Sequence, residues 1–225
     1  MNRTTLTTVI AVFEKDAKSE LRSRYAVSAI LLFILTTITI LLIGTKGENI
    51  QPGLAAGLLW VIMFFGSMMG LSRAFVSEEE RGTSLLLHIA VSSASIYFGK
   101  LIYNILLSLL LNTIALLLFF LFITNMPIEF FGIFILSHIF GSIGIAAAST
   151  IISVIIAKAN TKGALFPVLS FPIILPLIFI GIEATRIALE GRDNGHAAND
   201  IQLMIAYCGI VISLSYILFD LVWKD

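Results

Sequence analysis

The stretch LIYNILLSLLLNTIALLLFFLFI, Leu101–Ile123, contains no Asp, Glu, Lys or Arg. A helix needs about 20 mostly apolar residues to cross the hydrocarbon core of a bilayer. A transmembrane β-strand would instead alternate apolar and polar residues over about 10 positions, and this stretch does not. Because a helix satisfies its own backbone hydrogen bonds in lipid, the stretch predicts a membrane-spanning helix.

The rest of the chain has the same character. Its 225 residues are 58% hydrophobic and 12% charged, and the mean hydropathy is +1.02, which is too apolar for a soluble domain. Five further stretches are long and apolar enough to span, at about Tyr25–Gly44, Gly53–Leu71, Phe130–Ala157, Ala164–Ile182 and Ile201–Val222. We predict an all-α polytopic membrane protein with six transmembrane helices in one domain, residues 1–225.

The basic residues indicate an orientation. If the N-terminus is cytoplasmic, only Lys46, Arg186 and Arg192 of the 14 Lys and Arg residues fall in outer segments, and the other 11 (14 − 3) fall in inner ones. Positive charge is enriched on the cytoplasmic side of membrane proteins, so both termini are predicted to be cytoplasmic. Since the charge is sorted by membrane side, no basic face for nucleic acid is expected.

An amphipathic helix is predicted before the first span, over about residues 5–22. Its apolar residues recur at helical spacing, at Leu6, Val9, Ile10, Phe13, Ala17 and Leu21. Such a helix is typical of the inner membrane interface, and its direct continuation into a span favours that placement over a plain soluble helix.

The largest charged insert, Ser72–Lys100, directly precedes Leu101 and reads SRAFVSEEERGTSLLLHIAVSSASIYFGK. It combines the charged turn Glu78-Glu79-Glu80-Arg81-Gly82-Thr83, the apolar run Leu85–Val91 and the pair Gly99-Lys100. It lies on the predicted cytoplasmic side and is the largest connection there. The pair Gly99-Lys100 is not part of a GxxxxGK[ST] loop, so nucleotide binding by this chain is not expected.

Polar residues form stripes within two spans. Asn104, Ser108 and Asn112 follow one another at four-residue steps in the third span, and the fourth carries His138 on one face with Ser142, Ser149 and Ser153. Hydrogen bonding between helices explains both stripes, and so does the lining of a substrate path.

The fifth span contains Pro167, Pro172 and Pro176. Proline removes a backbone donor and crowds the preceding turn, so we predict a kinked or interrupted helix that is a candidate gating element. At its end, Glu183 and Arg186 are three residues apart and are predicted to pair on one helical face.

Catalytic and metal-binding patterns are missing from the sequence. There is no HExxH and no GxSxG with partner residues, Cys208 is the one cysteine, and His88, His138 and His196 are far apart. We therefore expect neither an enzyme nor a metal site, and none of the histidines is expected to be an obligatory heme ligand.

The insert resembles the coupling region of ABC-2-type permeases, in which a charged turn and a short helix between the second and third spans dock on an ATPase. The resemblance places this region at about residues 72–100. It assigns ATPase coupling to eight residues: Glu78, Glu79, Glu80, Arg81, Gly82, Thr83, Val91 and Lys100.

Over nearly its whole length the chain resembles the heme exporter protein B family, the CcmB-type permeases of cytochrome c maturation. The resemblance is carried by Phe13–Arg24, Gly57–Leu87, Phe171–Arg186 and Met204–Asp225, and the proline-rich span that ends in EATR discriminates best.

That resemblance implies a permease subunit in the bacterial cytoplasmic (inner) membrane that couples ATP hydrolysis by a partner either to heme transfer or to release of a heme-loaded chaperone. Heme is thus a candidate transported substrate, and ATP is bound by the partner. The implied partners are a cytoplasmic ABC ATPase, a second permease copy, a heme-handling membrane subunit with a tryptophan-rich motif, a small single-span subunit and a periplasmic heme chaperone. An ABC-2 exporter of a lipid, drug or polysaccharide and a scaffold that transports nothing remain alternatives.

Overall fold

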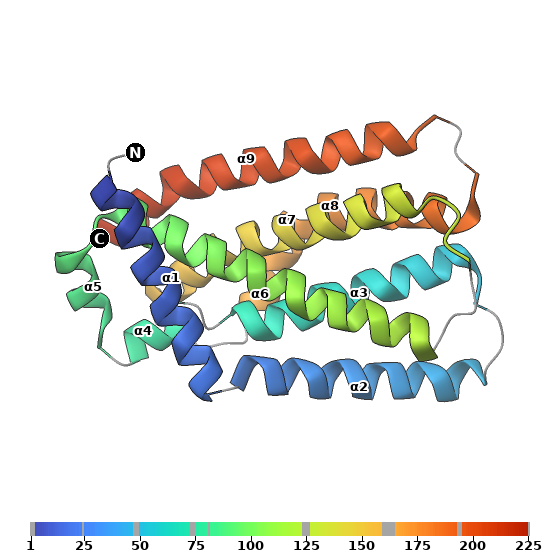
Figure 1. The fold of residues 1–225 in the computed structure, drawn as a ribbon, viewed down its shortest axis with the longest axis horizontal. Coiled ribbons are helices and arrows are strands. Elements are labelled where there is room, and N and C mark those ends of the chain that lie inside the picture. Colours follow the sequence, from blue (N-terminus) through green and yellow to red (C-terminus); the bar gives the residue numbers. More distant parts are fainter. Residues whose placement is uncertain are drawn as a thin grey trace.

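The computed structural model describes residues 3–23, 25–46, 50–72, 75–80, 82–122, 127–158, 165–192 and 195–224. These residues form nine α-helices and no strand (Figure 1). The helices are α1 (Arg3–Ser23), α2 (Tyr25–Thr45), α3 (Pro52–Leu71), α4 (Val76–Glu80), α5 (Ser84–Ala90), α6 (Ser93–Phe122), α7 (Phe131–Lys158), α8 (Leu165–Glu190) and α9 (Ala197–Lys224).

Six helices of the described chain are long and apolar enough to cross a membrane: α2, α3, α6, α7, α8 and α9. This confirms the predicted polytopic all-α class. Two of these helices run further than the hydropathy predicted. Helix α6 begins at Ser93 rather than near Leu101, and α8 continues to Glu190 rather than ending near Ile182. Nothing in either extension breaks a helix, so the polar residues there continue the turn pattern outside the apolar stretch.

The proline-rich helix α8 is continuous from Leu165 to Glu190, so an interruption is ruled out, while the predicted kink stays a prediction. Pro167 lies in the first helical turn, where its missing N–H costs nothing. Pro172 and Pro176 lie inside the helix, where each removes the hydrogen bond to the carbonyl four residues earlier. In the same stretch the Tyr207 hydroxyl of α9 donates to the Ile173 carbonyl over 2.8 Å and ties α9 to α8.

Helix α7 forms the centre of the bundle. Within its apolar window 78% is buried inside the protein, compared with 17% for α2 and for α9. It packs against α6, α8 and α9, and its Ala146, Ala147 and Ala148 are fully buried. Small side chains let helix backbones approach closely in a membrane, which explains why α7 accepts neighbours on several sides.

Helix α1 lies across one end of the bundle, over α6, as Figure 1 shows. The crossing is close at Gly99, where an added Cβ would lie 2.7 Å from the Val12 Cβ and 3.0 Å from the Val9 carbonyl oxygen. The helix occurs where the sequence predicted it, and Leu6, Ile10 and Leu21 remain exposed. Its placement in a membrane interface stays a prediction.

The two short helices α4 and α5 lie at the same end of the bundle as α1 (Figure 1). We call this end the insert end and the opposite end the far end. From here on, the insert means residues 75–92, the part of the charged stretch Ser72–Lys100 that precedes α6. The last turns of α9 also reach the insert end, where Trp223 contacts Phe75. The beginning and the end of the described chain therefore lie on one side, in keeping with the predicted topology.

Candidate functional site

Four charged side chains from three helices meet at the insert end: Lys15 and Asp16 of α1, Glu78 of α4 and Lys100 of α6. We call them the charge cluster. The Lys100 Nζ lies 2.9 Å from Asp16 Oδ2 and 3.4 Å from Glu78 Oε1, and Lys15 pairs with both carboxylates. The Lys100 side chain is only 1% exposed. A charge removed from water costs several kcal/mol unless it is paired, so these contacts fix α1 and α4 onto α6.

Glu78 is the centre of the charge cluster. Its Oε1 accepts hydrogen bonds from Lys15 and Lys100, and its Oε2 accepts one from the Thr83 hydroxyl at 2.5 Å. Burial alone would raise the pKa of Glu78, but the charge of Lys100 and the hydrogen bonds from Lys15 and Thr83 outweigh it and lower the pKa to about 2. The carboxylate therefore contributes stability above its ordinary pKa of 4.5, and this contribution is lost as the pH falls toward 2.

Aromatic rings tie the insert to α9. The Lys100 Nζ lies 4.8 Å from the centre of the Phe75 ring, a cation–π contact. Phe75 is buried, and its ring lies 5.6 Å from those of Phe219 and of Trp223. The base of the insert is thus held by both charge and aromatic packing.

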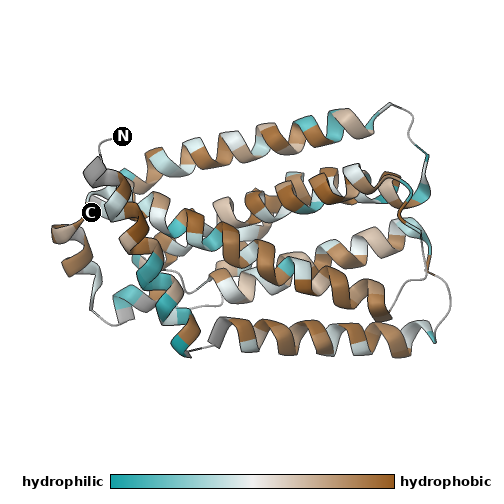
Figure 2. Ribbon diagram, in the orientation of Figure 1, coloured by the Kyte–Doolittle hydropathy of each residue, from teal (hydrophilic) through white to brown (hydrophobic). Residues whose placement is uncertain are grey.

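In contrast, α5 projects from the edge of the molecule (Figure 1). Leu86 is 67% exposed and Ile89 is 75% exposed, and Figure 2 shows this helix as hydrophobic. Helix α5 follows a turn at Gly82, whose φ of +66° suits glycine. Apolar side chains exposed beside a polar, anchored base are typical of a contact with another protein or with the membrane.

The polar stripe of α6 lies at its contacts with α7 and α3. Asn104 Nδ2 donates to Thr150 Oγ1 at 2.8 Å, and Ser108 Oγ donates to the Ser142 carbonyl at 3.1 Å. Asn112 donates to Ser142 Oγ at 3.1 Å and accepts from Ser67 of α3 at 3.1 Å. All of these side chains are buried, so the stripe binds three helices together. A part in a substrate path stays a prediction.

His138 is buried beside this network. Its Nε2 lies 3.1 Å from the Thr113 hydroxyl of α6, a hydrogen bond that accounts for one ring nitrogen. His196 lies before α9 and is exposed, and His88 lies in α5. Among the residues that the structure describes, no three His, Cys, Asp or Glu side chains gather in a way that would hold a metal ion.

Trp60 of α3 fills a slot between α7 and α8. Its Nε1 donates to Thr185 Oγ1 at 3.0 Å, and the same hydroxyl lies 3.1 Å from Ser137 Oγ. The walls of the slot are glycines. A Cβ at Gly141 would lie 2.6 Å from the indole, and a Cβ at Gly181 would overlap it. The indole therefore joins three helices toward the far end of the bundle.

At the far end, Arg186 lies between two carboxylates of its own helix. Its Nε donates to Glu183 Oε2 at 2.9 Å and its Nη1 to Glu190 Oε2 at 2.6 Å. The predicted pair of Glu183 and Arg186 is confirmed. Glu190 was missed because the predicted span ended at Ile182, which placed Glu190 in a loop.

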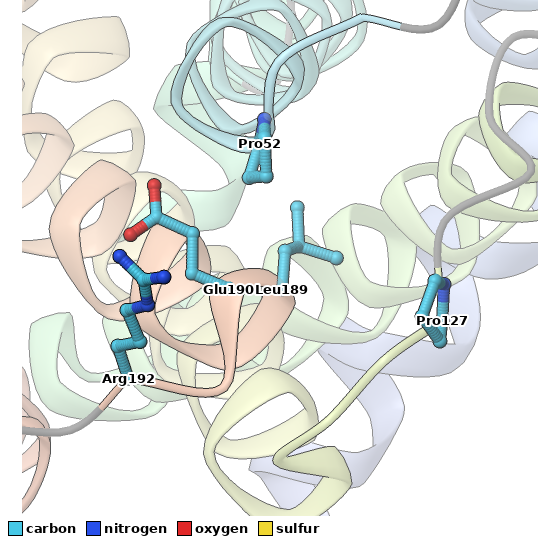
Figure 3. A pocket seen from close by; sticks show the side chains of 5 residues that line it. All are labelled: Pro52, Pro127, Leu189, Glu190 and Arg192. Atoms are coloured by element: carbon cyan, nitrogen blue, oxygen red, sulfur yellow. The ribbon is translucent and has the colours of Figure 1, made fainter.

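Glu183, Arg186 and Glu190 form what we call the ion triad. A pocket of about 390 Å³ lies beside it. It is lined by Pro52, Pro127, Leu189, Glu190 and Arg192, and Figure 3 shows these side chains around the opening. Glu190 is shared between the triad and the pocket.

The prolines of α8 lie on earlier turns of that helix, at Pro167, Pro172 and Pro176. A gating role for them stays a prediction.

The family model of the CcmB protein matches residues 7–216 of this chain. The chain belongs to the CcmB family. No curated protein matches it in sequence. CcmB is heme exporter protein B, a membrane permease subunit of cytochrome c maturation that is not itself catalytic. The matched region includes the charge cluster, α5, the α6 stripe and the ion triad.

The residues predicted for ATPase coupling in this CcmB protein separate into two groups. One group is the charge cluster with its neighbour: Glu78 and Lys100 pair with each other, and Thr83 donates a hydrogen bond to Glu78. The other group lies outside the cluster: Glu79 and Gly82 are exposed, and Val91 directly follows α5. The Glu80 side chain and Arg81 lie outside the described residues. Their role in coupling stays a prediction.

The sequence analysis missed the α1 half of the charge cluster. Asp16 is 84 residues from Lys100, and Lys15 is 63 residues from Glu78. Helical spacing places Asp16, three residues after Phe13 and seven after Val9, beside the apolar face of α1, and it places Lys15 on another face. No signal in a single sequence pairs them with residues of α4 and α6.

Proposed function

We propose that this CcmB protein couples ATP hydrolysis by a separate cytoplasmic ATPase to heme transfer, or to the release of a heme-loaded chaperone. The observation that carries the proposal is the exposure of Leu86 and Ile89 on α5, a short helix whose base is held by the charge cluster. A contact that transmits force needs an exposed surface and a rigid support, and the insert has both.

The proposal includes the orientation predicted from the basic residues: the insert end is cytoplasmic and the far end is periplasmic. It also includes the location in the inner membrane of a bacterium and a complex that contains a second permease copy. The far end would then meet the heme-handling subunit, the small single-span subunit and the periplasmic chaperone.

Leu86→Asp and Ile89→Asp are each expected to weaken binding of the ATPase. Burial of one such side chain contributes about 1.5–3 kcal/mol, which is roughly 10- to 100-fold in affinity. The measurement is the amount of ATPase that co-purifies with the tagged permease from membranes. Leu86→Met keeps the apolar surface and is the matched control. Undiminished co-purification with the Leu86→Asp, Ile89→Asp double variant would refute docking through α5.

Arg186→Ala is expected to lower the yield of mature cytochrome c more than Glu183→Ala does. Loss of Arg186 leaves both Glu183 and Glu190 without their partner, whereas loss of Glu183 leaves the contact with Glu190 in place. The yield is measured by heme staining at equal permease level. Full activity of both variants would leave the triad only an anchoring role, worth about 1 kcal/mol or less.

We expect heme to remain bound to assembled complexes of His88→Ala, His138→Ala and His196→Ala. The three histidines belong to different parts of the fold, and His138 already has a hydrogen-bond partner in Thr113. Absorption spectra and heme content of the purified complexes are compared with the parent. Loss of the heme signal in one variant, with the complex still assembled, would make that histidine a direct heme ligand.

A further inference from the structure

Three positions in the first turns of α6 hold α1 in place by contacts of different kinds. Gly99 receives the Val9–Val12 turn, Lys100 pairs with Asp16, and the Tyr103 ring lies 6.4 Å from that of Phe13. Backbone approach, charge and aromatic packing thus all fix α1 against the first turns of α6.

Helix α1 also reaches the insert directly. Adjacent residues of α1 bind different partners, since Asp16 pairs with Lys100 of α6 and Lys15 pairs with Glu78 of α4. Lys100 in turn pairs with Glu78. Two cations and two carboxylates therefore form a closed ring with no net charge that joins α1, α4 and α6. Removal of α4 or of α6 from the ring leaves an unbalanced charge among the remaining side chains.

The ring lies next to the docking surface proposed above. Thr83, whose hydroxyl binds Glu78, immediately precedes α5, and its carbonyl accepts a hydrogen bond from the Leu87 N–H in the first turn of α5. Two hydrogen bonds of Thr83 therefore connect Glu78 to α5, one from the Thr83 hydroxyl to Glu78 and one from the Leu87 N–H to the Thr83 carbonyl. Helix α1, with its exposed Leu6, Ile10 and Leu21, thus bears on the position of Leu86 and Ile89.

We propose that Lys100, Asp16 and Lys15 are positioning residues that make α1, the insert and the start of α6 one rigid unit, so that α1 sets the position of α5 on the ATPase. This inference rests on the proposed function. It adds α1 to the parts of the permease that move with the ATPase, whereas a purely structural cluster would only stabilise the fold.

The test measures the distance between α1 and α5 directly. Spin labels are placed at Ile10→Cys and Leu86→Cys, two exposed positions, in the full-length protein in lipid nanodiscs with Cys208 replaced by Ala. We expect a narrow distance distribution in the parent and broad ones in Asp16→Asn and Glu78→Gln. Glu14→Gln breaks an exposed pair with Lys18 on the same helix and is the matched control, expected to stay narrow.

A charge swap separates positioning from loss of fold. The double variant Asp16→Lys, Lys100→Asp keeps the net charge of the ring. Its distribution of α1–α5 distances is expected to be narrower than that of Asp16→Lys alone or of Lys100→Asp alone. A second readout, on unlabelled complexes, is the yield of cytochrome c per ATP hydrolysed, expected to fall several-fold in Asp16→Asn with the ATPase still bound and to be retained in Asp16→Glu.

Distributions as narrow in Asp16→Asn and Glu78→Gln as in the parent would overturn the inference. So would an unchanged yield per ATP in both variants. Failure of the proposed function looks different, because the ATPase would then not bind the parent protein although its α1–α5 distance is narrow.

Discussion

Lys100→Ala is expected to lower the free energy of unfolding by about 3–5 kcal/mol, because the largely buried carboxylates of Asp16 and Glu78 lose a fully buried cation and keep only the contacts with Lys15 described above. Lys100 is 1% exposed and contacts Asp16, Glu78 and the Phe75 ring. Lys18→Ala is the control, since Lys18 pairs with Glu14 in an exposed i,i+4 contact. Its expected cost is about 0.5 kcal/mol or less. Denaturant unfolding of the purified protein in detergent measures both.

Comparison of Lys100→Ala with a triple variant separates the effect of unpaired charges from that of the missing Lys100 side chain. The triple variant Asp16→Asn, Glu78→Gln, Lys100→Met removes all charges but that of Lys15, and it is expected to be more stable than Lys100→Ala because fewer unpaired charges stay buried. If Lys100→Ala is no less stable than Lys18→Ala, the charge cluster does not hold the insert.

Gly181→Ala is expected to destabilise the protein by about 1–3 kcal/mol through overpacking. The added Cβ would overlap the Trp60 indole, whose movement is restricted because Gly141 also lies against the ring and Thr185 accepts a hydrogen bond from its N–H. Gly57→Ala is the control on α3, where an added Cβ meets no heavy atom within 4 Å. It is expected to be neutral or to stabilise by up to about 1 kcal/mol.

Trp60→Phe should recover part of the stability lost in Gly181→Ala, because the smaller ring leaves room for the new methyl group. Thermal unfolding of the parent, Trp60→Phe, Gly181→Ala and the double variant measures this coupling in a double-mutant cycle. Equal losses for Gly181→Ala and Gly57→Ala would show that Trp60 does not fill the slot.

Hydropathy predicted the number and type of the long helices because the bilayer imposes a fixed length of apolar residues. It could not predict that α6 begins at Ser93 or that α8 continues to Glu190. Those turns lie beyond the apolar stretch, where helix and loop differ little in composition. The continuous α8 shows a related limit, since Pro172 and Pro176 lie inside a helix that the local sequence alone would interrupt.

The candidate site was predictable only in part. The pair of Glu183 and Arg186 is local, so helical spacing found it. The contacts between helices in the charge cluster, the slot of Trp60 and the α6 stripe join residues 22 to 125 positions apart, and such pairings depend on how helices pack rather than on spacing along the chain. The resemblance found the insert, but not that α1 supports it.

Site-directed cross-linking tests docking of the insert on the ATPase most directly. Single cysteines at two exposed positions, Glu79 of α4 and Ala90 at the end of α5, are compared with one at Lys158, which is exposed at the same end of the bundle. The account predicts that the cysteines at Glu79 and Ala90 form cross-links to the ATPase in the assembled complex and that the one at Lys158 gives markedly less. Cross-links from Lys158 with none from Glu79 or Ala90 would contradict it.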